Sequence, residues 1–467
     1  MDRCNDVSDE VAVVMVPLPA QGHLNQLLQF CCIFSSHGLP VHYVGSAIHN
    51  QQARLRANGG LDPNKIAKIH FHDLPTPDFA SPSPNPNASF KFPTHLQPTW
   101  DASQLLRHPT ARLLRELASK ARRIVVIHDY LMSYVVQDVA SIPNAESYNF
   151  NCVSVLSMVS YMYRGLGKKF VADGELRELM PPPEGCTTDE IVKLGIAQME
   201  HLSVRSGDIH NSNRLIEGPF IDLLEQNETA QKWKKQWFIA PILPANPNLN
   251  SKNPKNPNPC LDWLDEQPQS SVLYISFGTT TSMSEREVRE LALGLEHSKQ
   301  KFLWVLRDSD KGDIFSGKPR EIELPEGFEE RVKGVGMVVR DWAPQPEILA
   351  HRSTGGFMSH CGWNSCMESI TFGVPITAWP MHSDQPFNSF LVAQVLKTGL
   401  MVREWADRGE VVNSSAIENV VRRLMASEEG DEIRKRAQKL GENVRKSAQE
   451  EGVSQMELNS FIAHITR

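Results

Sequence analysis

Short, uninterrupted apolar runs, each followed by a stretch of helical periodicity, recur on both sides of a proline- and asparagine-rich segment. "VAVVMVP" (residues 11–17) opens the first series, and "SVLYISFG" (residues 271–278) opens the second. A strand that is apolar at every position is buried on both faces, which is typical of parallel sheets covered by helices. Alternation of such strands with helices predicts a doubly wound α/β sheet in each half of the chain.

The segment that divides the two series is "PILPANPNLNSKNPKNPNPC" (residues 241–260). Proline removes backbone donors and asparagine favours turns, so this composition indicates an exposed linker. We therefore expect an N-terminal domain over 1–240, a linker over 241–260 and a C-terminal domain over 261–450. Residues 451–467 are predicted to form a final helix that can pack back on the N-terminal domain.

A second irregular segment lies inside the N-terminal half. Residues 74–98, "LPTPDFASPSPNPNASFKFPTHLQP", are too rich in proline for regular structure. Long irregular loops in compact α/β folds often serve as lids or substrate-binding loops. Disordered decoration is the alternative interpretation.

Charge and composition exclude several functional classes. The net charge of −7 gives no general attraction for nucleic acid or anionic membranes. The polar first ten residues do not resemble a secretory signal, and no apolar run reaches eighteen residues. The eight cysteines match no metal or redox spacing, which favours buried, reduced thiols. We expect a cytoplasmic monomer whose partners are small molecules, with no nucleic acid and no membrane.

The stretch "HCGWNSCMESITFGVPITAWPMHSDQ" begins at His360, where an apolar strand ends, and a helix is predicted from about Asn364. In open α/β sheets, ligands bind beyond the carboxyl ends of the strands, where helix N-termini present free N–H groups. Asn364 and Ser365 in the first helical turn can donate to phosphate oxygens, and His360 adds another donor. Glu368, one turn further on, can accept from ribose hydroxyls. Any one of these residues also fits an ordinary capped helix, but together they favour a nucleotide diphosphate site.

Upstream of that stretch, Trp342 opens the loop "WAPQPEIL" after a predicted strand. An exposed tryptophan in such a loop is a suitable platform for a flat base, and Gln345 is near enough to bond the ribose or the base. A tryptophan half buried at the edge of the core explains the residue equally well.

Residues 342–385 resemble the signature box of plant secondary-product glycosyltransferases, which use UDP-sugars. "WAPQ", "HCGWNS", "ES", "FGVP", "WP" and the closing "DQ" stand at the family's spacing, while "PLPAQGHLNQ" and "SFGT" extend the resemblance over nearly the whole chain. The resemblance implies a GT-B fold, in which two Rossmann-like domains face a cleft. It also implies that the C-terminal domain binds the nucleotide sugar and that the N-terminal domain supplies most of the acceptor site.

The resemblance further implies a role for each matching residue. For the nucleotide it implies Trp342 stacked on uracil, Ala343 and Gln345 on the nucleoside, Glu368 on ribose, and His360, Asn364, Ser365 and Thr279 on the diphosphate. For the sugar it implies Trp363, Asp384 and Gln385. We also assign Asn151 to the donor, and His23 and Ser383 to the acceptor.

His23 and Asp129 are the candidate catalytic pair. Each follows a predicted strand of the N-terminal domain, so both can reach the same edge of the sheet. A neutral imidazole can remove a hydroxyl proton, and a carboxylate on its far nitrogen fixes the tautomer. On spacing alone the pair is a weak signal, because the chain has sixteen histidines. The family resemblance implies both roles.

Two features compete with this assignment. His128 adjoins Asp129, but as a strand residue it is expected to point away from it. Asp308-Ser309-Asp310 spells the DxD motif that other glycosyltransferases use to hold a metal. In "RDSDKGD" we interpret it as a solvated loop, and we expect a metal-independent enzyme with no cofactor.

Within the family, "IHDYLMS" and the "QD" that follows look most like the zeatin O-glucosyltransferase group of cytokinin enzymes. The expected function is an inverting O-glucosyltransferase that moves glucose from UDP-glucose, its co-substrate, to a hydroxyl of a small hydrophobic acceptor of the zeatin type. Alternatives are a broad flavonoid or phenolic O-glucosyltransferase, a UDP-xylose-using homologue and a sugar-nucleotide epimerase. A nicotinamide dehydrogenase is disfavoured, because the first strand lacks a GxGxxG turn.

Overall fold

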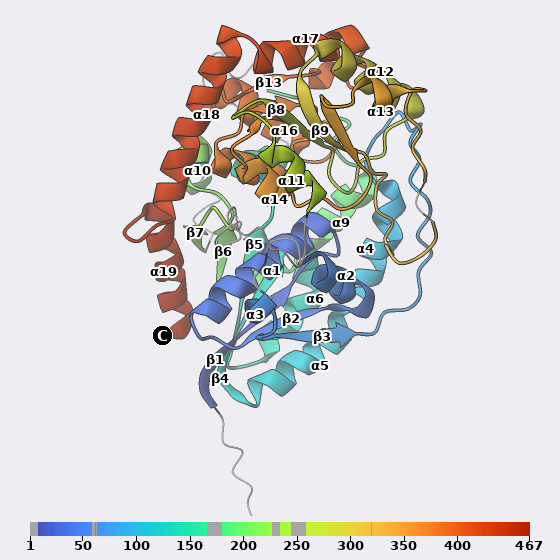
Figure 1. The fold of residues 1–467 in the computed structure, drawn as a ribbon. Helices are drawn as coiled ribbons and strands as arrows, with labels where there is room; N and C mark the ends of the chain where they lie inside the picture. Colours follow the sequence, from blue (N-terminus) through green and yellow to red (C-terminus); the bar gives the residue numbers. More distant parts are fainter. Residues whose placement is uncertain are drawn as a thin grey trace, which may run out of the picture.

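The computed structural model describes residues 8–57, 61, 63–165, 180–226, 234–243, 258–318 and 320–467. Residues 244–257, which form most of the predicted linker, lie outside the described residues. Two parallel sheets are stacked one above the other with helices around each (Figure 1). Among the described residues, no helix combines the length and the apolar character needed to cross a bilayer.

The N-terminal sheet has seven strands in the order β3-β2-β1-β4-β5-β6-β7. The strands are β1 (Ser8–Val16), β2 (Val41–Ser46), β3 (Ile69–Leu74), β4 (Ala121–Asp129), β5 (Ala145–Asn151), β6 (Gly207–His210) and β7 (Lys235–Phe238). Its principal helices are α1 (Gln21–Ser36), α2 (Ala47–Ala57), α4 (Gln97–Gln104), α5 (Arg107–Ala118), α7 (Val155–Gly165), α9 (Asp189–Met199) and α10 (Arg214–Gln226).

The C-terminal sheet has six strands in the order β10-β9-β8-β11-β12-β13. They are β8 (Val272–Ser276), β9 (Lys301–Val305), β10 (Gly336–Val339), β11 (Thr354–Ser359), β12 (Ile376–Ala378) and β13 (Gly399–Met401). The helices around it include α11 (Pro259–Asp265), α12 (Glu285–Ser298), α14 (Gln345–Ala350), α15 (Trp363–Phe372), α16 (Gln385–Phe390), α17 (Ser414–Met425) and α18 (Glu428–Ser447). The central strands are buried where their apolar runs predict: residues 11–16 of β1, residues 124–129 of β4, and all of β8 and β11.

The last helix, α19 (Val453–Thr466), leaves the C-terminal half and packs against β7 of the N-terminal sheet. Figure 1 shows α18 and α19 running along one side of both sheets. Phe461 is fully buried there, with its ring centroid 5.1 Å from that of Tyr148 and 4.9 Å from that of Trp237. The end of the chain therefore completes the hydrophobic core of the first domain.

The irregular segment that precedes α4 is ordered and reaches the other half of the molecule. It runs beside the loop that follows β9, on the right of Figure 1. The backbone N–H of Gly312 donates to Ser81 Oγ at 2.6 Å, and Lys91 Nζ lies 2.7 Å from Glu287 Oε2. These contacts contradict disordered decoration and show that the segment ties the two domains together.

The interpretation of Asp308 and Asp310 as part of a solvated loop is wrong. The side chains of Asp308 and Asp310 are only 7% and 12% exposed, and Asp308 pairs with Arg320. Asp310 accepts two hydrogen bonds from Arg56 of α2, at 2.6 and 2.9 Å. Arginines from both domains therefore form ion pairs with the two carboxylates. The local sequence does not reveal these contacts.

We predict that Phe461→Ala lowers the free energy of unfolding by about 3–5 kcal/mol, because it leaves a cavity in a closely packed aromatic cluster. Denaturant unfolding followed by tryptophan fluorescence would measure the loss, since Trp237 lies in this cluster. Met456→Ala on the same helix is the control: Met456 is 60% exposed and should change stability by less than about 0.5 kcal/mol. Equal losses in the two variants would contradict the docking of α19.

Candidate active site

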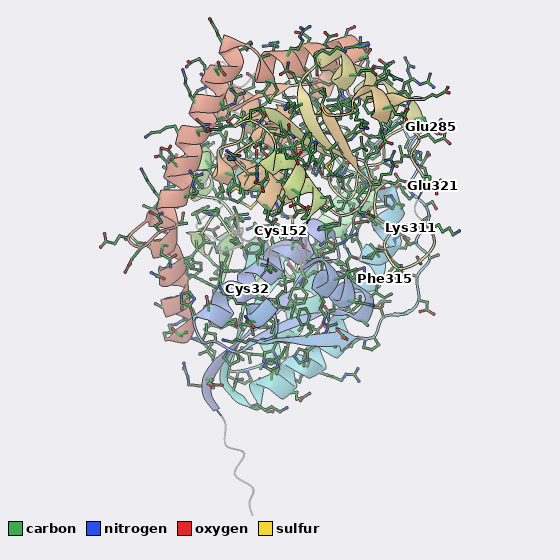
Figure 2. The ribbon with its side chains drawn as sticks, in the orientation of Figure 1. Cys32, Cys152, Glu285, Lys311, Phe315 and Glu321 are labelled. Carbon is green, nitrogen blue, oxygen red and sulfur yellow. The ribbon has the colours of Figure 1, made fainter. Side chains whose placement is uncertain are left out.

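A cavity of about 1200 Å³ lies where the carboxyl ends of both sheets face each other. Parallel strands all end at the same edge, so residues from distant parts of each domain converge there. In the side-chain view Cys152, a lining residue, lies at the level where the two domains meet (Figure 2). The lining includes every residue assigned to catalysis, to the donor or to the acceptor: His23, Asp129, Asn151, Thr279, Trp342, Ala343, Gln345, His360, Trp363, Asn364, Ser365, Glu368, Ser383, Asp384 and Gln385.

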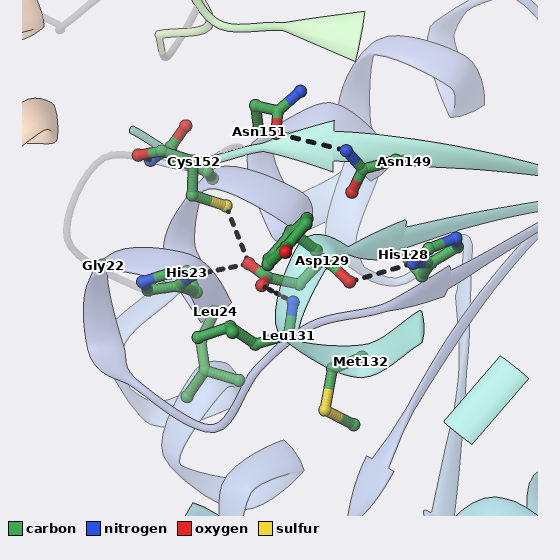
Figure 3. Close-up of polar contacts among 12 residues, drawn as sticks. Gly22, His23, Leu24, His128, Asp129, Leu131, Met132, Asn149, Asn151 and Cys152 are labelled. Carbon is green, nitrogen blue, oxygen red and sulfur yellow. Dashed lines mark hydrogen bonds and ion pairs between the residues drawn. The ribbon is translucent and has the colours of Figure 1, made fainter. Parts of the chain in front are cut away.

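His23 and Asp129 are brought together by neighbouring strands. Val16 at the end of β1 pairs with His128 of β4, so the loop after β1 and the last residue of β4 share one edge of the sheet. His23 lies in the first turn of α1, and its Nδ1 is 2.5 Å from Asp129 Oδ2. The other carboxylate oxygen of Asp129 accepts from the backbone N–H of Leu131 at 2.9 Å (Figure 3).

The surroundings of this pair favour a charged carboxylate and a basic imidazole. Burial alone would lower the pKa of His23, but the charge and hydrogen bond of Asp129, with a contribution from Asp384, raise it above the usual 6.5. Burial would raise the pKa of Asp129, yet His23 and the Leu131 N–H lower it overall. Asp129 is therefore ionised at neutral pH and can stabilise a protonated His23.

Cys152 is a third member of the cluster that the sequence did not single out. Its Sγ donates to Asp129 Oδ2 at 3.1 Å, the same oxygen that His23 contacts (Figure 3). Cys152 follows the last residue of β5, the strand that pairs with β4 on the side away from β1. Its position at the end of that strand was the available signal, because it predicts the same edge of the sheet.

His128 does not compete with His23. Its side chain is buried, its Nδ1 bonds the backbone oxygen of Asp129 at 2.9 Å, and burial lowers its pKa to about 4. Figure 3 shows His128 and His23 on opposite sides of Asp129. The His128 ring therefore contacts the backbone of Asp129 and leaves the carboxylate to His23.

Helix α15 begins at the mouth of the cavity and is capped by Gly362. His360 precedes it, and a Cβ on either Gly278 or Gly362 would lie 2.6 Å from His360 Nε2. Gly278 also has φ +73°, a conformation that side chains disfavour. Burial lowers the pKa of His360 to about 4, so at neutral pH this ring offers a hydrogen bond and no charge.

A hydrogen-bonded network joins the start of α14 to α15. Gln345 Nε2 donates to Glu368 Oε2 at 2.7 Å and to Ser365 Oγ at 3.0 Å. Burial raises the pKa of Glu368 to about 7, so a ligand that donates hydrogen bonds would stabilise its ionised form.

Trp342 also lines the cavity, and 40% of its surface is exposed. The guanidinium carbon of Arg56 lies 4.6 Å from its ring centroid and that of Arg307 lies 5.4 Å away. Both arginines pair with Asp310. The tryptophan is therefore neither a core residue nor a freely solvated one, and sequence reasoning missed both of its cationic neighbours.

At the other end of the cavity, several predicted side chains are already engaged. Asn388 Nδ2 donates to Asp384 Oδ2 at 2.8 Å, while Gln385 Oε1 accepts from the backbone N–H groups of Met381 and His382 at 2.9 and 3.0 Å. Asp384 keeps one carboxylate oxygen for a ligand, and the amide nitrogen of Gln385, which lies 3.3 Å from His382 Nε2, keeps one N–H.

Other predicted residues contact the opposite domain. Trp363 Nε1 donates to the backbone oxygen of Asn211 at 2.8 Å, and Asn364 Nδ2 donates to that of Gly22 at 2.8 Å. Asn151 differs from these residues, because it lies on β5 and its amide contacts Asn149 and His210 of its own domain. The backbone N–H of Ser383 donates to the oxygen of Cys186 at 2.7 Å. The signature residues therefore hold the domains together as well as lining the cavity.

Two parallel α/β domains that share one cavity at their carboxyl edges form the arrangement known as the GT-B fold. Comparison with solved structures agrees. A UDP-glucosyltransferase from Polygonum tinctorium, capable of glucosylating indoxyl, is 25% identical, with a TM-score of 0.77 over 98% of this chain and 99% of its own. A UGT transferase from Siraitia grosvenorii, solved in complex with UDP, is 28% identical, with a TM-score of 0.73 over 98% and 100%.

Family profiles cover nearly the whole chain. "Glycosyltransferase, N-terminal domain" matches residues 9–244, and "UDP-glucoronosyl and UDP-glucosyl transferase" matches residues 230–429. Zeatin O-glucosyltransferase of Phaseolus lunatus is 50% identical over 98% of this chain and 97% of its own. Zeatin O-xylosyltransferase of Phaseolus vulgaris is 49% identical over 98% of both. The protein belongs to the plant UDP-glycosyltransferase family, and it is an enzyme that transfers a sugar from a UDP-sugar to a small acceptor.

We predict that Gly278→Ala weakens UDP binding by on the order of 1–3 kcal/mol, because the new methyl group displaces His360 from the cavity. It should also lower stability by about 1 kcal/mol through the positive φ. Gly38→Ala is the matched control, since Gly38 has φ +78° but nothing within 4 Å of the added Cβ. Calorimetric titration with UDP should separate the two variants, and equal UDP affinities would contradict the role of the His360 position.

Proposed function

We propose that the protein is an inverting O-glucosyltransferase that transfers glucose from UDP-glucose to the hydroxyl of a small hydrophobic cytokinin of the zeatin type. The observation that carries this proposal is the 2.5 Å contact between His23 Nδ1 and Asp129 Oδ2, in the same cavity as the signature box. Base, carboxylate and box all come from one chain, so a monomer is sufficient for the reaction.

His23 acts as the general base. Nδ1–H donates to Asp129, which leaves Nε2 free to accept the proton of the acceptor hydroxyl. As that proton moves, the acceptor oxygen forms a bond to C1 of the sugar. The bond between C1 and the phosphate oxygen breaks, and UDP leaves with the electron pair. A single displacement of this kind inverts the configuration at C1. Asp129 stabilises the imidazolium that forms and does not take the proton itself.

The C-terminal domain binds the donor. Trp342 stacks on the base, and the Gln345–Glu368 network supports the proposed contacts of the nucleoside and the ribose. The N-terminus of α15 and the neutral His360 donate hydrogen bonds to the diphosphate. Together with the dipole of α15, these bonds stabilise its negative charge without a metal. Thr279, Asn364 and Ser365 line the same part of the cavity.

Glucose is the proposed sugar because of the two residues that close the box. Asp384 supplies a carboxylate oxygen, and the Gln385 amide supplies a donor, a combination that suits an equatorial pair of hydroxyls. The buried carboxylate of Asp384 would repel a glucuronate carboxylate. The relatives include a zeatin O-glucosyltransferase at 50% identity and a zeatin O-xylosyltransferase at 49%, so the choice of glucose rests on the two residues that close the box.

The zeatin-type acceptor is supported by the relatives and by the apolar wall of the cavity on the N-terminal side. Two further relatives, the cis-zeatin O-glucosyltransferases 1 and 2 of Zea mays, are each 42% identical over 99% of this chain. Side chains of this wall include Phe92, Trp100, Leu131, Met158, Ile191, Ile196 and Met199. Such a surface fits a flat, largely apolar acceptor and offers few charges. A panel that includes flavonoids and simple phenols would test whether the acceptor range is wider.

We predict that His23→Ala lowers kcat by roughly 10²–10⁴-fold, the usual contribution of a general base, while UDP affinity changes little. The loss should be smaller with an acidic acceptor such as a nitrophenol, whose hydroxyl ionises without help. Initial rates with both acceptors and titration with UDP would measure these effects. Near-wild-type turnover, or an equal loss with both acceptors, would contradict His23 as the base.

We predict that equimolar competition between UDP-sugars gives mainly the glucoside. UDP-galactose and UDP-glucuronate should each lose on the order of 1–3 kcal/mol for a bond lost to a buried partner. UDP-xylose is the stronger competitor, since it keeps the C3 and C4 hydroxyls and lacks only the C6 group. Gln385→Ala should erode the glucose preference more than it weakens UDP binding. An excess of xyloside, galactoside or glucuronide from the wild-type enzyme would overturn the donor assignment.

A further inference from the structure

The Cys152 thiol is the one member of the His23–Asp129 cluster that the proposed reaction does not use. A ring nitrogen of His23, a carboxylate oxygen of Asp129 and the sulfur of Cys152 all lie within 4.8 Å of one another. Asp129 Oδ2 is 2.5 Å from His23 Nδ1 and 3.1 Å from Cys152 Sγ. All three residues line the cavity, so an ion in solution can reach them. Figure 3 shows the three side chains converging from α1 and from the ends of β4 and β5.

The chemistry of these three atoms suits one class of ligand. An imidazole nitrogen, a thiolate sulfur and a carboxylate oxygen are the groups that bind Zn²⁺ in proteins, and three protein ligands with one open position form an accessible site. Hard cations such as Mg²⁺ prefer an all-oxygen shell and gain little from sulfur. The nearby Asp384, whose charge acts on both His23 and Cys152, adds negative potential that attracts a cation.

We propose that His23, Asp129 and Cys152 form a binding site for Zn²⁺ and related thiophilic divalent cations, and that occupation of this site inhibits the enzyme. The inhibition, though not the binding, rests on the proposed role of His23 as the base. The ion is an inhibitor at this position and takes no part in the transfer reaction.

Inhibition follows from the nitrogen that the metal would occupy. In the catalytic tautomer, Nδ1 carries hydrogen toward Asp129 and Nε2 holds the free electron pair. A metal on Nδ1 requires that hydrogen to move to Nε2, so the nitrogen that should accept the acceptor's proton becomes an N–H donor. The metal also binds Asp129 Oδ2, so Asp129 can no longer accept the hydrogen bond from His23 or stabilise its imidazolium form.

Metal binding displaces one proton. In the free enzyme the Cys152 thiol carries that proton and donates it to Asp129 Oδ2 at 3.1 Å. Metal binding replaces the sulfur–hydrogen bond with a metal–sulfur bond and releases one H⁺ to solvent.

The test measures initial rates over a series of buffered free Zn²⁺ concentrations, with each variant compared with its own metal-free rate. Cys152→Ser is the matched variant, because a hydroxyl can still donate to Asp129 but is a poor ligand for a soft metal. We expect the half-inhibiting Zn²⁺ concentration to rise at least about tenfold in Cys152→Ser and Cys152→Ala. Excess EDTA should restore the metal-free rate of the wild type, and Mg²⁺ should have no effect.

Cys366→Ala controls for the other thiol cluster, because Cys366 lies beside Cys361 in the C-terminal domain. Inhibition that persists in both Cys152 variants, or that disappears in Cys366→Ala, would overturn the proposal.

Binding can also be observed without catalysis. Co²⁺ should give a thiolate charge-transfer band with wild-type enzyme that is lost in Cys152→Ser, and absence of that band would overturn the site. A Cys152-dependent band without inhibition would overturn the inhibitory role and would count against His23 as the base.

Discussion

Both parallel sheets present their carboxyl edges to a single cavity, and the functional geometry of this enzyme depends on that constraint. Parallel strands end together, so β1, β4 and β5 bring His23, Asp129 and Cys152 to one point, although His23 is more than a hundred residues away from the other two in sequence. His360 and the start of α15 follow the end of β11, so they lie at the facing edge of the C-terminal sheet. One architectural rule thus places the proposed base and the proposed nucleotide site opposite each other.

Within this frame, the electrostatics of the two sides differ. On the N-terminal side a buried carboxylate raises the pKa of His23, which makes this imidazole a better proton acceptor. On the C-terminal side burial without a carboxylate partner lowers the pKa of His360 to about 4, so this ring stays neutral. The same side chain serves two chemistries because its neighbours differ. In the proposed mechanism, proton transfer needs the first environment and diphosphate binding needs the second.

Much of this arrangement is predictable from sequence, because the decisive signals are local. Continuous apolar runs identify buried strands, and strand–helix alternation identifies the two parallel sheets. The box from Trp342 to Gln385 is a single uninterrupted motif, and each of its predicted residues lines the cavity. His23 and Asp129 are harder to predict from sequence, because their contact depends on the pairing of β1 with β4. Only the family resemblance distinguishes them from the other histidines and carboxylates.

What the sequence did not reveal depends on contacts between distant segments. The DxD-like loop is a clear example, because Asp310 binds Arg56 from the other domain and is not a solvated carboxylate. Arg56 also lies over Trp342, so one arginine contacts the proposed base platform and the domain interface together. The position of Cys152 after β5 predicts the edge of the sheet at which it lies, but its contact with the Asp129 carboxylate depends on the pairing of β4 with β5.

The central claim is that Asp129 makes His23 a base suited to neutral pH. The most direct test is an NMR titration of the His23 imidazole in the wild-type protein and in Asp129→Asn. We expect a pKa above 6.5 in the wild type, where the charge and hydrogen bond of Asp129 outweigh burial. In the variant, burial is no longer opposed by that charge, and the pKa should fall below 6.5. A wild-type pKa below this value, or one that does not change in Asp129→Asn, would contradict the account.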